Sequence, residues 1–307
     1  MRNSDPRSGR PAAVEPLRHS RSEDSILAAR LAALALAAAS GLVPPALQAQ
    51  DEEKEEQLNR VWQIEGLHTG FCVQLLLDPA QLDVALPRDA RPLRADAIED
   101  LGPAMRAAVS GQPEFAAWTP STLCLYYMQT VDVGSLRVSE RDLGKYPMLG
   151  IWALAAADNA GGGRKDVVLR LFTNTGRLER AGQVNGLDLR MVRSSVREIG
   201  NEDNPGAPPI GTRYQFKLGK TLVTWDGRRV SDSTKATGPV ATSWRADSKR
   251  RGPMSARLVL TPEWTKAMVG SLRVEGEDAF ARAIMASPIR YVAPAMLGGG
   301  GELAFGR

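Results

Sequence analysis

Residues 149–173, with the sequence LGIWALAAADNAGGGRKDVVLRLFT, contain the pattern that decides the fold class. An apolar run over 149–157 is followed by a Gly-rich segment over 158–165, and 166–173 then alternates along the chain. Two strand-like runs joined by a Gly-rich turn are typical of an antiparallel hairpin. We therefore predict a β-hairpin here, with 158–165 as its loop and as a sub-boundary within the domain.

Strand-like patterns recur on both sides of this hairpin, over 70–77, 122–133, 187–199, 212–218, 221–225 and 255–260. Helical signals are fewer: helical spacing over 95–109, a start signal at Thr261-Pro262-Glu263, and helical spacing over 277–287. About ten short strands separated by turns favour a sheet that meanders over a parallel sheet with crossover helices. The sequence predicts a mainly β fold, an antiparallel sandwich or barrel-like meander, with an early helix and short C-terminal helices.

Residues 1–49 have the composition of a signal peptide with a long polar n-region. Scattered arginines precede an apolar run over 26–43, and its uninterrupted part, 31–43, is too short to cross a bilayer. Leu47-Gln48-Ala49 then offers a small residue for cleavage. This pattern predicts export to the periplasm or the extracellular space, with a retained N-terminal anchor as the alternative, and it leaves no transmembrane span after cleavage.

The remainder of the chain divides into three parts by composition. Residues 50–66 begin with a run of acidic residues and predict a flexible lead-in. Residues 67–295 predict a single β-rich globular domain, and the Gly-rich residues 296–307 predict a disordered tail.

The formal charge is nearly balanced, with 39 basic and 35 acidic residues and a net charge of +4. Nucleic-acid-binding proteins normally concentrate a larger basic excess, so we expect no nucleic-acid partner. The nearly neutral charge indicates no particular partner class, and a carbohydrate or another envelope protein is the partner expected of an exported protein of this kind.

Two cysteines, Cys72 and Cys124, each lie in an apolar, strand-like run. In an oxidising compartment an even number of cysteines predicts a disulfide, and two buried thiols on neighbouring strands are the alternative. Two cysteines and the one histidine downstream of the leader, His68, do not make a zinc site. We therefore predict no metal and no cofactor.

The sequence offers no catalytic residue. His68 has no G-x-S-x-G motif to accompany it, and a structural role is expected for it. Gly161-Gly162-Gly163 lacks the spacing of a phosphate-binding loop. The oxygens of 201–206 do not alternate as those of a calcium loop do.

Four residues are the candidates for ligand binding: Trp225, Trp244, Arg190 and Arg213. Polar residues flank both tryptophans near strand ends, where an exposed ring could stack on a sugar, although core packing is the common role of tryptophan. Arg190 and Arg213 belong to a set of basic residues interleaved along strands, with Arg193, Arg197, Lys217, Arg228 and Arg229. Because alternate residues of a strand share a face, several of these would form either an anion- or lipid-headgroup-binding face or a solvated outer face.

Together these features predict an exported, non-catalytic binding or interaction protein of the cell envelope or extracellular space. One alternative is a structural subunit of a larger envelope complex. Another is a secreted hydrolase that uses two nearby carboxylates on a polysaccharide. Its candidate acids are Asp188, Glu198, Asp226 and Glu263.

Overall fold

The structure is a computed structural model that describes residues 60–81, 86–87, 89–128, 131–133, 136–138, 147–158, 164–200, 211–229, 234–236, 238–249, 251–287 and 295–306. The predicted signal peptide (1–49), most of the loop at 158–165 and the segment 201–206 lie outside these residues. Within the described part, no helix is long and apolar enough to cross a membrane.

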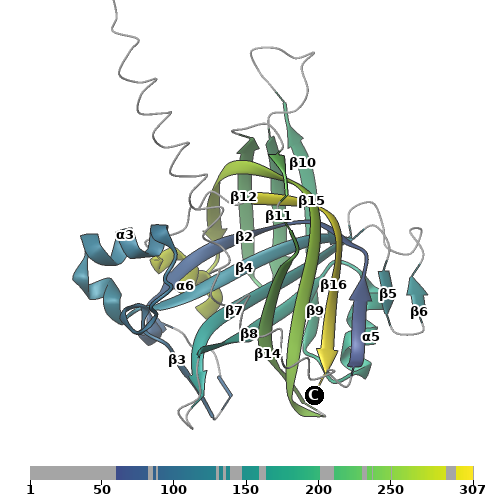
Figure 1. Cartoon of the computed structure of the whole chain (residues 1–307), viewed down its shortest axis with the longest axis horizontal. Coiled ribbons are helices and arrows are strands. Elements are labelled where there is room, and N and C mark those ends of the chain that lie inside the picture. Colours follow the sequence, from purple (N-terminus) through teal and green to yellow (C-terminus); the bar gives the residue numbers. More distant parts are fainter. Residues whose placement is uncertain are drawn as a thin grey trace, which may run out of the picture.

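The described part of the chain is mainly β, as predicted (Figure 1). Its strands are β1 (Arg60–Glu65), β2 (Leu67–Leu77), β3 (Ala90–Pro92), β4 (Thr119–Met128), β5 (Val131–Val133), β6 (Leu136–Val138), β7 (Met148–Asp158), β8 (Arg164–Thr173), β9 (Leu189–Met191), β10 (Arg193–Ile199), β11 (Gly211–Leu218), β12 (Thr221–Arg229), β13 (Thr234–Lys235), β14 (Val240–Ser248), β15 (Gly252–Glu275) and β16 (Ala295–Gly306). Its α-helices are α3 (Pro103–Gly111), α5 (Gly176–Val184) and α6 (Ala279–Ala286), and short 3₁₀ turns cover Pro79–Gln81, Ala95–Ala97 and Pro113–Ala117.

Seven strands close into a barrel, in the order β14, β8, β7, β4, β2, β16 and β15, with β15 pairing again with β14. Neighbours in this ring are antiparallel, except for β14 and β8, which are parallel. The hairpin predicted over 149–173 forms the β7–β8 pair of the ring. Closing the ring leaves the barrel strands without a free edge.

Alternate residues of the barrel strands point into an apolar interior. On β4, for example, Cys124 and Tyr126 belong to the interior cluster, whereas Leu123 and Leu125 belong to a second cluster outside the barrel. The two-residue period of a strand produces this division. Trp244 and Phe305 are the largest interior side chains from β14 and β16.

The disulfide between Cys72 and Cys124 links β2 to β4 within the barrel wall. Cys72 and Cys124 are direct register partners, so the bond joins neighbouring strands. The Tyr126 hydroxyl lies 3.5 Å from the Cys72 sulfur. Burial raises the pKa of Tyr126 above its usual range.

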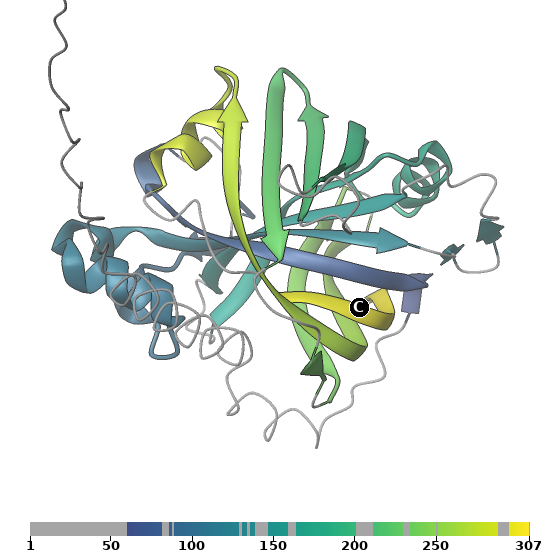
Figure 2. The same ribbon diagram turned by 90° about the horizontal axis from the view of Figure 1, so that it is seen from above.

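β15 connects the barrel to a second sheet, and it crosses most of the molecule in Figure 2. Its first part pairs with β14 and β16, and its last part, from Met268, pairs with β12. The second sheet therefore has the order β10, β11, β12, β15. Its inner face and α6 pack on the outside of the barrel, where Phe71 stacks on Trp225 with ring centroids 4.0 Å apart.

Three local predictions differ from the structure. The lead-in predicted as flexible to residue 66 contains β1 over its last residues, since Trp62 and Ile64 are buried against β16. The tail predicted as disordered from 296 is β16, which lies between β15 and β1. Its glycines allow close packing, because a Cβ at Gly301 would lie 2.5 Å from the Leu260 side chain.

The helix start predicted at Thr261-Pro262-Glu263 is instead the middle of β15. β16 pairs with Thr261 and Pro262, while β14 and β13 pair with the other edge of β15 just before and just after this segment, at Leu260 and Trp264. These ladders outweigh a local capping preference. Pro262 has no N–H to donate, and the irregularity in the β15–β16 register between Pro262 and Trp264 accommodates it.

Candidate functional site

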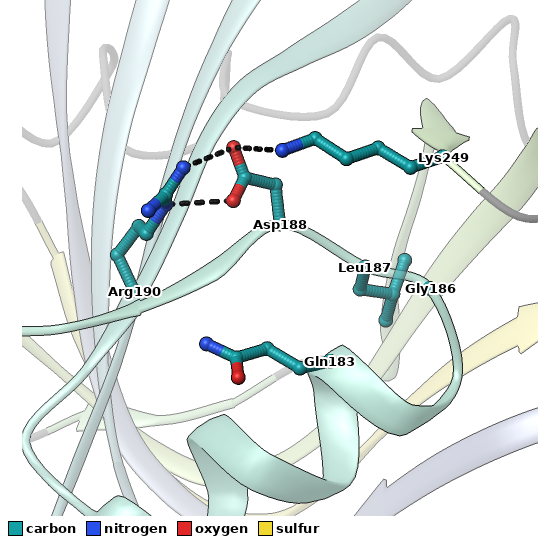
Figure 3. Close-up of a pocket in the computed structure, with 6 residues that line it drawn as sticks. All are labelled: Gln183, Gly186, Leu187, Asp188, Arg190 and Lys249. Atoms are coloured by element: carbon teal, nitrogen blue, oxygen red, sulfur yellow. Dashed lines mark hydrogen bonds and ion pairs between the residues drawn. The ribbon is translucent and has the colours of Figure 1, made fainter.

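A shallow depression of about 280 Å³ lies where α5, β9 and the β14–β15 turn meet (Figure 3). Six residues line it: Gln183, Gly186, Leu187, Asp188, Arg190 and Lys249. We call this the ionic depression, because three of these residues carry charges that point toward one another. Asp188 lies between Arg190 and Lys249 in Figure 3.

The C-terminal end of α5 forms one wall of the ionic depression. The helix ends in a left-handed turn, with φ +84° at Gly186. The Gly186 N–H donates to the Gln183 carbonyl at 3.0 Å, and the Leu187 N–H donates to the Gly182 carbonyl at 3.0 Å. This is the usual way in which glycine ends a helix, since a Cβ opposes the left-handed conformation.

The buried residues around this turn hold it against the barrel interior. Leu178 of α5, Leu187 and Leu189 all belong to the interior cluster. Glu179 accepts a hydrogen bond from the backbone N–H of Met191 at 2.9 Å, which ties the first turn of α5 to β9. Asp188 and Arg190 therefore project from a segment that is fixed on both sides by buried leucines.

Lys249 reaches the ionic depression from a distant part of the sequence. It follows β14, and its backbone N–H donates to the Gly186 carbonyl at 3.0 Å. Gly252, with φ +75°, begins β15 three residues later. One hydrogen bond thus couples the β14–β15 turn to the end of α5.

The charged groups form an ion-pair network with one anion and two cations. Arg190 donates to Asp188 through Nε at 2.6 Å and through Nη2 at 3.2 Å, a bidentate arrangement. The Lys249 ammonium lies 3.8 Å from Asp188 Oδ2, the oxygen that also accepts from Arg190 Nη2. The network has a formal charge of +1, and its three side chains are 41–73% exposed.

Chemically, the ionic depression offers hydrogen-bond donors and positive charge. Asp188 takes two of the five N–H donors of Arg190, so the others remain available on the guanidinium. The Gln183 amide lies beneath Asp188 and Arg190 in Figure 3 and donates to the Leu189 carbonyl at 3.3 Å. No group of acidic, cysteine or histidine side chains within the described residues could hold a metal ion.

The four predicted ligand-binding residues lie in different surroundings. Only Arg190 belongs to the ionic depression. Arg213 lies on the exposed face of the second sheet, where Asp226 accepts its Nε hydrogen bond at 2.5 Å and raises the pKa of the guanidinium. Trp225 and Trp244 are 1% and 6% exposed, so the structure packs both rings in its cores and presents neither to solvent.

The four acids considered for a hydrolase are not gathered in one cleft. Asp188 lies in the ionic depression, Glu198 is on β10, Asp226 is on β12 and Glu263 is on β15. Asp226 is paired with Arg213 and lies 3.7 Å from Arg273. The side chain of His68 lies outside the described residues.

No protein-family model matches the sequence, and no curated protein is significantly similar to it. Several solved structures are similar to this chain, each with a TM-score below 0.5. Acetoacetate decarboxylase from Legionella pneumophila is 9% identical, with a TM-score of 0.43 over 86% of this chain and 94% of that one. An acetoacetate decarboxylase-like enzyme from Sphingomonas wittichii RW1 is 10% identical, with a TM-score of 0.41 over 80% and 89%.

A third similar structure is the enduracididine biosynthesis enzyme MppR in complex with pyruvate, which is 12% identical, with a TM-score of 0.42 over 83% and 92% of the two chains. All three of these proteins are enzymes. The prediction of a non-catalytic binding or interaction protein finds no support in these similarities. No activity and no residue role is transferred from them at these identities and TM-scores.

Sequence reasoning missed Lys249, Gln183 and Gly186. Lys249 follows a strand, β14, that we did not predict, and its position depends on a hydrogen bond to Gly186. Gly186 carries the one signal that was available, because an Asn-Gly pair after Val184 is typical of a helix C-terminus.

Proposed function

We propose that this protein binds a small carboxylate-bearing molecule in the ionic depression. The observation that supports the proposal is the convergence of Arg190 and Lys249 on one carboxylate, that of Asp188, from segments far apart in the sequence. A second carboxylate can take up the donors that Asp188 leaves available. Arg190 is suited to this role because its planar guanidinium matches carboxylate geometry.

The volume of the ionic depression limits the size of the ligand. Ligand sites for drug-sized molecules occupy roughly 300–1,000 Å³. At about 280 Å³, the ionic depression accommodates a molecule of a few heavy atoms rather than a nucleotide or a sugar chain. Only Leu187 supplies an apolar side chain to the lining, so charge and hydrogen bonding provide the affinity.

Lys249 acts in this proposal as a positive charge and not as a nucleophile. An amine nucleophile is activated by burial or by a neighbouring cation, both of which favour its neutral form. The Lys249 side chain is 73% exposed, and its closest charged partner is the Asp188 carboxylate.

Isothermal titration calorimetry with matched pairs of ligands tests the proposal. Acetate and pyruvate are compared with acetamide and pyruvamide, which keep the size and lose the charge. We expect the carboxylates to bind with a Kd on the order of 1 mM, and the amides to give no measurable heat. Equal binding of acids and amides, or no binding of either, would contradict the proposal.

Two variants locate the binding. Arg190→Gln removes the guanidinium and keeps a polar side chain, so we expect affinity for carboxylates to fall roughly 10- to 100-fold. Arg106→Gln is the matched control, because Arg106 is an exposed arginine of α3 that does not line the ionic depression. Equal loss in both variants would place the binding elsewhere.

A further inference from the structure

The outer face of the second sheet collects most of the basic residues of its strands. Its side chains come from alternate positions of β10, β11, β12 and β15, which pair in register along the sheet. Six of these side chains are basic and exposed: Arg193, Arg197, Arg213, Lys217, Arg228 and Arg273. We call this surface the basic face.

The registers place these six residues on one side of the sheet. Arg193 is paired with Lys217, and Arg197 with Arg213. Arg213 is paired in turn with Asp226, and Asp226 with Ser271, on the same side. The residues between them, such as Tyr214 and Phe216, point inward and are buried against the barrel.

The basic face carries two acids, Asp226 and Glu275, against its six basic residues. Its formal excess of four positive charges equals the net charge of the whole chain, +4. Positive charge is therefore concentrated on this face of the second sheet. Such an arrangement orients a protein toward an anionic partner.

Most of the cations on the basic face are not neutralised by neighbours. Asp226 accepts a hydrogen bond from Arg213 Nε at 2.5 Å, and its carboxylate lies 3.7 Å from Arg273 Nη2. Within the described part of the chain, Arg193, Arg197, Lys217 and Arg228 form no ion pair. These four cations are free to meet external anions.

The shape and composition of the basic face favour a planar partner. Its cations extend in two dimensions, across four strands about 4.8 Å apart and along them at alternate residues. None of its positions carries an aromatic residue, so it offers no platform for stacking on sugars or nucleic-acid bases. Anionic lipid headgroups present negative charge in a plane and need no stacking partner.

We propose that the basic face binds the surface of a membrane rich in anionic phospholipids. The attachment is peripheral, through arginine and lysine contacts with headgroup phosphates. No apolar side chain of this face is fully exposed, so no insertion into the hydrocarbon is expected. The basic face shares no residue with the ionic depression, so the two proposals can fail independently.

Co-sedimentation of the full chain with vesicles tests this proposal. Vesicles of phosphatidylcholine alone are compared with vesicles that also contain phosphatidylglycerol, at low and high salt. The test variant is Arg193→Gln, Arg197→Gln, Lys217→Gln. The matched control is Arg106→Gln, Arg180→Gln, Arg257→Gln, which removes three exposed arginines outside the basic face.

Each basic residue near an anionic membrane contributes roughly a fivefold increase in partitioning, so the test variant should bind phosphatidylglycerol vesicles on the order of 100-fold more weakly. The control should lose far less, and high salt should abolish the difference. Binding to pure phosphatidylcholine by both variants would report on the apolar run 26–43 and is subtracted. Equal loss in the two variants, or binding to a soluble polyanion such as heparin without binding to vesicles, would overturn the proposal.

Discussion

Replacing Gly270 by alanine tests how the second sheet packs on the barrel. Gly270 lies on β15 beside Trp225 of β12, and its backbone φ is not positive, so alanine is compatible with its conformation. An added Cβ would lie 2.6 Å from two carbon atoms of the Trp225 indole. Carbon atoms in contact are normally about 3.5–4.0 Å apart, so the indole must move by roughly 1 Å.

The indole has little room for such a shift. Trp225 is 1% exposed and stacks on Phe71, and a Cβ at Gly227 would meet the same ring at 1.9 Å. Overpacking of this kind costs about 1–3 kcal/mol, and the lower chain entropy of alanine in the unfolded state returns about 0.4–1 kcal/mol. We therefore expect Gly270→Ala to lower the free energy of unfolding by about 1–2 kcal/mol.

Urea denaturation followed by tryptophan fluorescence measures this change. Gly300→Ala is the control, because the nearest atom to its Cβ would be the Thr261 hydroxyl at 3.4 Å, and stability should stay level or rise slightly. Trp225→Phe should cost less in the Gly270→Ala background than in the native chain, since the smaller ring relieves the overlap. If Gly270→Ala were as stable as Gly300→Ala, the indole could not lie across β15 as described.

Two further predictions concern the barrel interior. Burial raises the pKa of Tyr126, so the folded state keeps the phenol proton to higher pH than the unfolded chain does. The free energy of unfolding therefore keeps its full value below about pH 10 and falls by about 1.4 kcal/mol per pH unit above it. Tyr126→Phe should flatten the dependence of the urea midpoint on pH between about 9 and 11, and an unchanged slope would show that the hydroxyl is hydrated. Replacing both Cys72 and Cys124 by alanine opens a loop with a sequence separation of 52, and the free energy of unfolding in non-reducing urea should fall by up to about 4 kcal/mol. The native protein unfolded under reductant should lose the same amount, which would assign the effect to the disulfide. A negligible loss in the variant would contradict the prediction.

The mainly β fold could be predicted from alternation because each barrel strand divides its residues between an apolar interior and another environment. The β7–β8 hairpin follows this rule, with apolar runs on either side of a Gly-rich segment. The prediction of a cross-strand partner for Cys72 had the same origin, since both cysteines lie in apolar, strand-like runs. Each of these signals lies within a single segment of the chain, so it can be recognised from the sequence alone.

The errors arose where pairing with distant strands decides the structure. β16 is rich in glycine and has a low intrinsic preference for strand, yet β15 and β1 pair with it on both sides. Thr261-Pro262-Glu263 carries the residues of a helix start, but β16 pairs with β15 there, and β14 and β13 pair with its other edge on either side of the segment. Neither outcome is encoded in the segment itself.

The two surfaces could be anticipated to different extents. The period of the strands indicated that several of the interleaved basic residues would share a face, and the registers place Arg193, Arg197, Arg213 and Lys217 together. Arg190 was a candidate, but Lys249, the second cation of the network, is 59 positions away and is brought close by the backbone hydrogen bond to Gly186. Spacing within one strand is readable from sequence, whereas a contact between two turns requires the folded chain.

The most direct test of the account is a side-chain NMR titration of Arg190 with a small carboxylate. The guanidinium Nε–H resonance of Arg190, assigned with the Arg190→Gln variant, is followed as pyruvate and then pyruvamide are added. The account predicts a saturable shift of this resonance with pyruvate and none with pyruvamide, while the Nε–H resonance of Arg213 stays in place. A shift of Arg213 with Arg190 unmoved, or an equal response to the uncharged amide, would contradict it.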